Sequence, residues 1–287
     1  MFISTYIIKA PAKLNIRLKI TGLRSDGYHD LISVMVPVDL FDLLTLNMLS
    51  SERIAIEVKG FNVPTDETNL VYRAAESFLS HTGIKKGISI KLVKNIPVAA
   101  GLGGGSSDAA ATLLSLNEIF SRPLSLSHLH DLAVQLGADV PFFLYCKPSL
   151  ATGIGEILEP LDKWPACWYI LVTPPLPVST SWVYRNLKLE LTRGEYDYIL
   201  NFLKKTPINI SHILENDLEK VTSVSFPIIN TIKKILVDAG AEGAIMSGSG
   251  PTVFGVFSSL NRAVSARQYL ISKDLGDVFM ATNWEKT

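Results

Sequence analysis

The chain of 287 residues carries 27 Lys and Arg against 27 Asp and Glu, so its formal net charge at pH 7 is zero. A neutral chain has no long-range field that gathers phosphate backbones, which argues against general nucleic-acid binding. With 47% hydrophobic and 19% charged residues, the composition excludes a mainly disordered protein. Two cysteines, Cys146 and Cys167, are too few for a disulfide framework. The length predicts two domains, or one large one.

No targeting signal is evident. The stretch Met1–Lys9 lacks the basic start and the long apolar run of a signal peptide. No segment approaches the roughly 18 consecutive apolar residues of a membrane span. We therefore expect a soluble, cytoplasmic protein with no membrane partner.

The first predicted strand covers residues 6–20. Apolar side chains alternate there with polar ones, and this period of two predicts a strand with one buried and one wet face. Lys13, Asn15, Arg17 and Lys19 share the wet face. Further strands are predicted at Leu31–Val38, Leu43–Leu49, Ile54–Val58 and Ile88–Leu92, and helices at Asn69–His81, Ala109–Phe120 and Ser127–Leu136.

The texture of the chain changes after residue 150. A linker is predicted at 162–166, since Trp, Pro and charged residues gather there. Beyond it the patterns predict strands at Trp168–Thr173 and Val253–Phe257, helices near Ser181–Leu187, Glu195–Leu203 and Asn230–Ala239, and a small-residue loop at Gly240–Pro251. Strands and helices mix without regular βαβ alternation, which predicts an α+β fold with a boundary near residue 160.

The run Gly101–Asp108 is the strongest local signal for a ligand. Glycines permit positive φ, so that consecutive backbone N–H groups converge on one anion, and the helix expected next offers its positive dipole end. Ser106 and Ser107 add hydroxyl donors and N-cap chemistry. No Lys follows as Walker A requires, and Ser106 occupies the last glycine position of the dinucleotide fingerprint. The remaining alternative is a flexible glycine linker, which the flanking strand and helix disfavour.

Asp139 stands two residues past Gly137, the glycine expected to end a helix, and an apolar run follows it. A carboxylate beside an apolar wall is a candidate to accept a proton from a substrate hydroxyl. Because Pro141 follows, Asp139 is equally typical of an N-cap for a new short helix. The two roles are compatible, since one oxygen can cap while the other faces a site.

Weaker signals come from other polar and aromatic side chains. Lys13 beside Asn15 could offset phosphate charge, although ordinary strand polarity explains both. Tyr28 and His29 follow a glycine-containing turn, and rings there could hold a nucleobase, although core or rim packing is the commoner use. The late run 246–252 permits close backbone approach to a ligand or to another loop, but it is equally typical of a tight αβ turn, and the sequence favours neither interpretation.

Five motifs in chain order carry a family resemblance: APAKLN at 10–15, GYH at 27–29, PVAAGLGGGSSDAA at 97–110, LGADVPFF at 136–143 and SGSGPT at 247–252. Together they resemble the superfamily of galactokinase, homoserine, mevalonate and phosphomevalonate (GHMP) kinases. Within it they are most similar to the branch that acts on a cytidine-diphosphate derivative of a methylated polyol. The resemblance spans most of the chain.

This resemblance implies a two-domain fold, with an ATP-binding domain at 1–160, a ferredoxin-like substrate-binding domain at 161–287 whose last strands could return to the first, and the active site in the cleft between them. The implied reaction moves the γ-phosphoryl of ATP to the 2-hydroxyl of 4-diphosphocytidyl-2-C-methyl-D-erythritol, a step of the non-mevalonate isoprenoid pathway. The implied needs are ATP and Mg²⁺. A nucleic-acid partner is not expected, and a monomer or a weak homodimer remains open.

Residue roles follow from the matching motif positions. Asp139 matches the catalytic base, and Lys13 the catalytic lysine. Asn69 matches a position near the adenine, and the loop around the triphosphate matches Pro97, Val98, Ala99, Ala100, Gly101, Leu102, Gly103, Gly104, Gly105, Ser106, Ser107 and Asp108. The positions expected to hold the substrate are Asn15, Tyr28, His29, Thr180 and Tyr184. Tyr184 replaces a Phe of the family's Thr-x-x-x-Phe spacing, and the direct ligands of Mg²⁺ are not readable, although Ser106 or Ser107 could serve.

Two alternatives remain at this point. A sister kinase acting on homoserine or a mevalonate derivative would share the phosphate loop, but it has no need of Tyr28 and His29. A catalytically inactive nucleotide-binding regulator could keep the glycines and lose the chemistry, yet Lys13 and Asp139 are both present.

Overall fold

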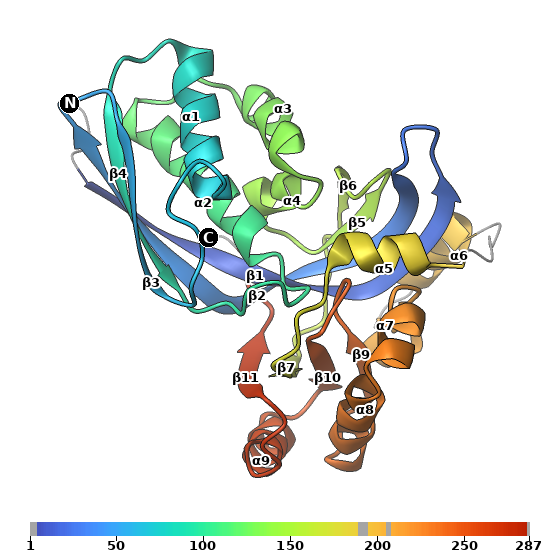
Figure 1. Cartoon of the computed structure of the whole chain (residues 1–287). Coiled ribbons are helices and arrows are strands. Elements are labelled where there is room, and N and C mark those ends of the chain that lie inside the picture. The colour runs from blue at the N-terminus through green and yellow to red at the C-terminus, as the bar shows by residue number, and fades with distance from the viewer. Residues whose placement is uncertain (1–4, 189–194, 205–207, 286–287) are drawn as a thin grey trace.

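The computed structural model describes residues 5–188, 195–204 and 208–285, which form two sheets with helices packed on them. Residues 1–4 of the amino-terminal stretch considered above lie outside the described residues. The α+β expectation is confirmed. Figure 1 shows the first sheet with its helices in the upper part of the view and the second sheet below.

The first sheet is built on two long antiparallel strands, β1 (Thr5–Leu23) and β2 (His29–Leu49). It runs in the order β3-β4-β2-β1-β8, and β5 and β6 extend it at β2. Its other strands are β3 (Ile54–Gly60), β4 (Gly87–Lys94), β5 (Ser149–Thr152), β6 (Ile157–Pro160) and β8 (Glu215–Asn216). The two strands predicted at 31–38 and 43–49 are therefore one continuous strand, β2.

The wet face predicted for β1 is wrong. Lys13, Asn15, Arg17 and Lys19 are all buried, at 2–7% exposure. Acidic side chains from the second half of the chain cover the outer pair of cations. Arg17 pairs with Glu195 and, at 2.6 Å, with Glu215, and Lys19 lies 2.6 Å from Glu215 and 3.2 Å from Asp217. Buried charges need such partners, and alternation along one strand cannot reveal them.

Four helices cover one face of the first sheet (Figure 1): α1 (Leu70–Thr82), α2 (Gly104–Ile119), α3 (Leu126–Leu136) and α4 (Val140–Tyr145). Their ends follow local chemistry. Asn69 caps α1 by accepting the N–H of Val71, and Gly137 ends α3 as predicted. Helix α2 is buried on nearly every side, and its small alanines let it sit between the sheet and the other helices.

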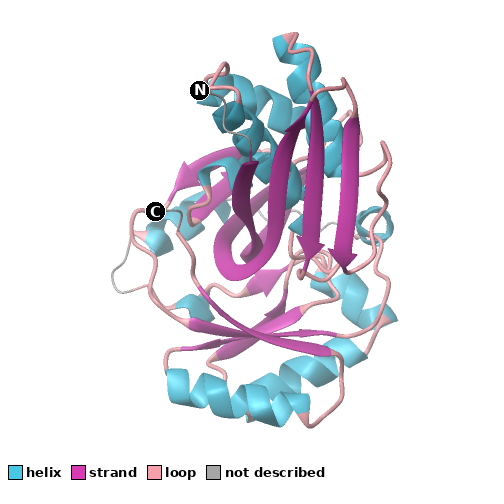
Figure 2. Ribbon diagram, turned by 90° about the vertical axis from the view of Figure 1, so that its left-hand side faces the viewer, coloured by secondary structure: helices cyan, strands magenta, loops and turns pink. Residues whose placement is uncertain are grey.

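The second sheet runs in the antiparallel order β11-β7-β10-β9. Strands β7 (Trp168–Thr173) and β10 (Val253–Phe257) have the predicted bounds. Strand β9 (Gly243–Met246) lies inside the predicted small-residue loop, and β11 (Asp277–Thr282) was not predicted. Helices α8 (Ile228–Asp238) and α9 (Leu260–Ile271) pack beneath this sheet (Figure 2).

Short elements connect the two sheets. Although β8 comes late in the chain, it pairs in parallel with β1 of the first sheet, and Asn283, just after β11, forms a bridge to Val38 of β2. The remaining elements are α5 (Thr180–Asn186), α6 (Glu195–Leu203), the 3₁₀ turn η1 (Ile210–His212) and α7 (Glu219–Ser225). No helix within the described ranges combines the length and apolar character that crossing a bilayer requires.

Candidate active site

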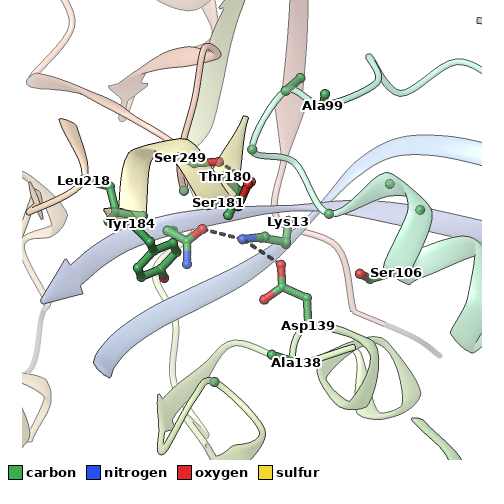
Figure 3. Close-up of a pocket in the computed structure, with 18 of the residues that line it drawn as sticks. Lys13, Ala99, Ser106, Ala138, Asp139, Thr180, Ser181, Tyr184, Leu218 and Ser249 are labelled. Carbon is green, nitrogen blue, oxygen red and sulfur yellow. Dashed lines mark hydrogen bonds and ion pairs between the residues drawn. The ribbon is translucent and has the colours of Figure 1, made fainter. Parts of the chain in front are cut away.

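A cleft of about 1300 Å³ opens where the first sheet, helix α2 and helix α5 meet. Its wall draws residues from both halves of the chain, from Lys13 on β1 to Ser249 before β10. Figure 3 shows that Lys13 and Asp139 point toward each other in its centre, with Tyr184 on one side and Ser106 on the other. A concave site with a few convergent polar groups is the expected form of a small-molecule pocket.

The glycine-rich loop folds into the start of α2. The helix begins at Gly104 rather than near Ala109, so most of the predicted loop is its first turn. The N-cap position is Gly103, in the left-handed region at φ 69°. Ser106 and Ser107 are thus helical residues, and the expectation that they cap α2 is wrong. The first turn of a helix leaves N–H groups without intrahelical partners, and Gly104, Gly105 and Ser106 of this turn line the cleft, as an anion site requires.

Close approach explains the glycine at 103. A Cβ there would lie 2.8 Å from the ring of Phe143 and 3.0 Å from Cγ of Lys13. The loop therefore packs directly against Lys13 and Phe143, and a larger residue would push Lys13 away.

The structure separates the expected loop residues into two groups. Pro97, Val98, Ala99, Ala100, Gly101, Gly103, Gly104, Gly105, Ser106 and Asp108 line the cleft. Leu102 does not, because its side chain is buried in a core cluster with Ile96 and Ala100. Ser107 is also buried, and its hydroxyl has no hydrogen-bond partner among the described residues. Leu102 and Ser107 can therefore offer a ligand only their backbone groups and not their side chains.

A buried ion cluster lies beneath this loop, and two of its members, Lys94 and Asp42, were not predicted from the sequence. Lys94 Nζ pairs closely with Asp42 and lies 2.8 Å from Asp108 Oδ2. Asp42 Oδ1 also accepts the backbone N–H groups of Asn95 (2.6 Å) and Ile96 (2.8 Å). One lysine thus joins the chain entering the loop to the helix leaving it. Lys94 is an ordinary basic residue at the end of a strand, before Asn-Ile-Pro. Nothing in this local sequence predicts a buried ion cluster.

Asp108 is the member of this cluster whose carboxyl group is most affected by burial. Burial raises the pKa of its carboxyl group well above 3.8, Lys94 opposes the shift, and Asp42 adds to it. Its Oδ1 atom has no partner within the described chain. Asp108 touches the cleft, but its Oδ2 atom is directed to Lys94 rather than outward.

Lys13 and Asp139 form the centre of the site. Lys13 Nζ lies 3.2 Å from Asp139 Oδ2 and also donates to Asn15 Oδ1. The amine is buried, whereas the Asp139 side chain is 36% exposed and open to the cleft. Asp139 does hold the N-cap position of α4, with Pro141 in the first turn, but in the described structure its side chain makes no capping hydrogen bond. The N-cap position is thus as predicted, but the capping hydrogen bond is not made, and the carboxylate is directed to the lysine instead.

Aromatic side chains line the far end of the cleft. His29, at the start of β2, and Tyr184, on α5, have ring centroids 5.1 Å apart and planes tilted by 37°. Burial and the charge of Asp139 raise the pKa of Tyr184 above its usual range. Tyr28 is 59% exposed on the rim. Thr180 also lines the cleft, where its hydroxyl is 2.8 Å from that of Ser249 (Figure 3).

Asn69 lines the opposite end of the cleft, near the first turn of α2. Its side chain is already engaged, since Oδ1 accepts from Val71 N at 2.9 Å and Nδ2 donates to Pro64 O at 2.6 Å. An amide has spare donor and acceptor capacity after two such bonds. Asn69 can therefore cap α1 and still offer a polar group to a ligand.

The late glycine turn, Met246–Thr252, packs against the glycine-rich loop. Ser247 Oγ donates to Gly101 O at 2.9 Å, and a Cβ on Gly101 (φ 76°) would overlap Ser247 O. Gly101 and the turn can therefore approach only because this residue is glycine. The close backbone approach that the sequence allowed for the late run is therefore present, and Gly248 and Ser249 also reach the cleft wall.

Comparisons with known proteins agree with this geometry. Sequence models of the GHMP kinases N terminal domain and the GHMP kinases C terminal domain match residues 69–147 and 199–275. A 4-diphosphocytidyl-2-C-methyl-D-erythritol kinase of Geobacter metallireducens is 48% identical over 263 residues, which cover 91% of this chain and 92% of the relative. The same-named kinase of Syntrophotalea carbinolica is 46% identical, with 92% and 94% covered.

Solved structures share the fold. A crystal structure of 4-(cytidine 5'-diphospho)-2C-methyl-D-erythritol kinase superposes with a TM-score of 0.81 at 35% identity, over 96% of this chain and 98% of that one. A homoserine kinase from Cytophaga hutchinsonii, at a TM-score of 0.78 and 21% identity over 99% and 96% of the two chains, shares the architecture alone. The chain belongs to the GHMP kinase family, in the branch of the 4-diphosphocytidyl-2-C-methyl-D-erythritol kinases.

Proposed function

We propose that this chain transfers the γ-phosphoryl group of ATP to the 2-hydroxyl of 4-diphosphocytidyl-2-C-methyl-D-erythritol, giving the 2-phosphate and ADP in the non-mevalonate isoprenoid pathway. One observation carries the proposal. A single cleft joins the glycine-rich loop, the Lys13–Asp139 pair and the His29–Tyr184 pair. The glycine-rich loop would bind phosphate, the Lys13–Asp139 pair would act on the acceptor hydroxyl, and the His29–Tyr184 pair would bind a base. A kinase whose acceptor carries a nucleotide needs these three groups in this order along the cleft.

ATP would occupy the end of the cleft between α1 and α2. Backbone N–H groups of 101–107 and the start of α2 would receive the phosphates, because preorganised donors stabilise charge without reorganising. Asn69 would lie against the adenine. The ion cluster of Lys94, Asp42 and Asp108 would keep the two ends of the loop in place.

The acceptor hydroxyl would sit between Asp139 and the γ-phosphate. Phosphoryl transfer depends mainly on positioning and charge stabilisation, so Asp139 would orient the hydroxyl and accept its proton late in the reaction. The amine of Lys13 would orient the carboxylate of Asp139 and offset charge on the transferred group. Asn15, which accepts from the same amine, would contact the polyol.

The cytidine end would lie against the aromatic side chains. His29 can read the polar edge of a base, and the rings of Tyr184 and Tyr28 offer flat surfaces. The 5.1 Å contact between His29 and Tyr184 keeps this part of the wall preformed. Thr180 would fix the start of α5, which carries Tyr184.

Mg²⁺ fits the oxygen donors of the cleft, since hydroxyl, carboxylate and phosphate oxygens are its usual ligands. Among the described residues, no group of three or more His, Cys, Asp or Glu side chains could hold a metal ion. Ser106, which lines the cleft at the start of α2, would hold the ion together with the phosphates of ATP. When bound, it supplies positive charge to the phosphates.

ADP release, measured in parallel with the cytidine-diphospho substrate, homoserine and mevalonate, tests this function. We expect release with the cytidine-diphospho substrate alone. Release only with homoserine or mevalonate would identify a sister kinase, and no release with any of the three would favour a nucleotide-binding regulator. The domain limits of 1–160 and 161–287, a cytoplasmic location and a monomer or weak homodimer remain further parts of this proposal.

A further inference from the structure

The side chain of Asn216 lies outside the cleft, yet it holds the late glycine turn in place. We propose that Asn216 is a positioning residue of the phosphoryl-transfer site, which acts by fixing this turn against the glycine-rich loop and the strand of Lys13. The inference rests on the function proposed above and adds a residue to it. Nothing in the motif at 247–252 points to this partner from β8.

Both amide hydrogens of Asn216 are committed to the turn. Nδ2 donates to the backbone carbonyls of Met246 (2.8 Å) and Gly248 (2.7 Å), and Oδ1 accepts the N–H of Leu218 at 2.9 Å. The side chain is 5% exposed, so water cannot replace these bonds. Pairing with Leu18 in the β1–β8 register fixes its own backbone.

The late glycine turn also contacts the glycine-rich loop and the strand that carries Lys13. Ser247 Oγ donates to Gly101 O and accepts the backbone N–H of Asn15 at 3.2 Å. The N–H of Thr252 reaches Ala100 O at 3.3 Å. Asn15 also accepts from the Lys13 amine. A displacement of the turn would therefore move the entry of the glycine-rich loop and the lysine together.

Only an amide suits position 216. A carboxylate would set an oxygen against two carbonyl oxygens, and alanine would leave both carbonyls buried without a donor. Without these two hydrogen bonds the turn would change its conformation, because Gly248 (φ 55°) and Gly250 (φ 85°) give its backbone freedom. The expected consequence is misplacement of Ala100 and Gly101.

Asn216→Asp and Asn216→Ala test the proposal, with Asn283→Ala as the matched control. Asn283 also donates to a backbone carbonyl, that of Pro165 at 3.0 Å, but it does not line the cleft. We expect both Asn216 variants to raise KM for ATP at least tenfold and to lower kcat, at a temperature where melting curves show them folded. Asn283→Ala should lose comparable stability and keep KM for ATP within twofold. The proposal is overturned if folded Asn216 variants keep their KM for ATP, or if Asn283→Ala raises it equally.

A milder variant covers the case in which Asn216 variants do not fold. Ser247→Ala removes one hydroxyl between the turn and Gly101, and it should raise KM for ATP several-fold; a KM within twofold of wild type would overturn the proposal. ADP affinity by calorimetry on the same variants gives a second readout. Wild-type protein that binds ADP but does not phosphorylate the cytidine substrate would count against the proposed function, while the ADP affinities would still decide the role of Asn216.

Discussion

The amine of Lys13 lies 3.2 Å from Oδ2 of Asp139, and this contact joins the first strand of the fold to the start of α4. The Lys13 amine is buried in the protein, whereas the Asp139 carboxylate is partly exposed to the cleft. An ion pair of this kind fixes the orientation of the carboxylate, and a base must be held within reach of the proton that it accepts. The contact therefore gives the catalytic assignment a geometry that can be tested.

Asp139→Asn should keep the fold and lose most of kcat. General base catalysis typically contributes about 10²- to 10⁴-fold, and the amide cannot accept the proton. Asparagine can still accept a hydrogen bond from Lys13, so ADP affinity and melting temperature should change little. Steady-state kinetics with both substrates measures this, and near-normal turnover would refute the base assignment.

His29→Ala should weaken the cytidine substrate by about 1–3 kcal/mol, the usual cost of leaving a buried polar group without its partner. KM for ATP should stay unchanged, because His29 lies at the other end of the cleft from α2. The two KM values, determined on one preparation, separate the effects. An unchanged KM for the cytidine substrate would count against a base-binding role for this end of the cleft.

Gly101→Ala should destabilise the protein by about 3 kcal/mol or more, since it combines a left-handed backbone with overlap against Ser247 O. Gly83→Ala is the matched control. Gly83 has a similar φ of 65°, but a Cβ there would meet nothing within 4 Å, so the cost should be only about 1–2 kcal/mol. Urea denaturation compares them. Equal losses would mean that the packing of Gly101 against the late glycine turn contributes nothing.

Asp108 should give stability a measurable pH dependence. Its pKa is raised by burial above 3.8, so the unfolded state releases this proton at lower pH than the folded state does. The contribution of Asp108 is therefore complete below 3.8 and is lost as the pH rises through the folded value. The difference in unfolding free energy between wild type and Asp108→Asn should fall as the pH rises above 3.8 and through the folded pKa of Asp108. A difference that grows with pH would show that the folded carboxyl is already ionised.

Local sequence patterns predicted many of the strands and helices correctly. The bounds of β7, β10 and α6 match the prediction, because each depends on a short apolar period that its own residues display. The period of β1 was correct too, but its wet face was wrong. The acids that bury Arg17 and Lys19 come from α6 and from residues 215–217, and no local pattern connects them.

The residues of the site likewise fall into those that the sequence predicted and those that only the structure reveals. Motif positions indicated Lys13, Asp139 and the glycine-rich loop, and the structure brings them into one cleft. The loop's supports could not be found, since Lys94, Asp42 and Asn216 act through contacts between distant segments. Their residue types are ordinary, and only the fold shows what they hold.

The proposed regiochemistry gives the most direct test of the account. In 4-diphosphocytidyl-2-C-methyl-D-erythritol the 2-hydroxyl is on a carbon that carries a methyl group and no hydrogen. A phosphate transferred to it has no proton three bonds away, so the product's new monoester should give a singlet in a proton-coupled ³¹P spectrum, with ADP formed in equal amount. A doublet or triplet would place the phosphate on the secondary or primary hydroxyl and contradict the orientation assigned to Asp139, and no new monoester would contradict the kinase itself.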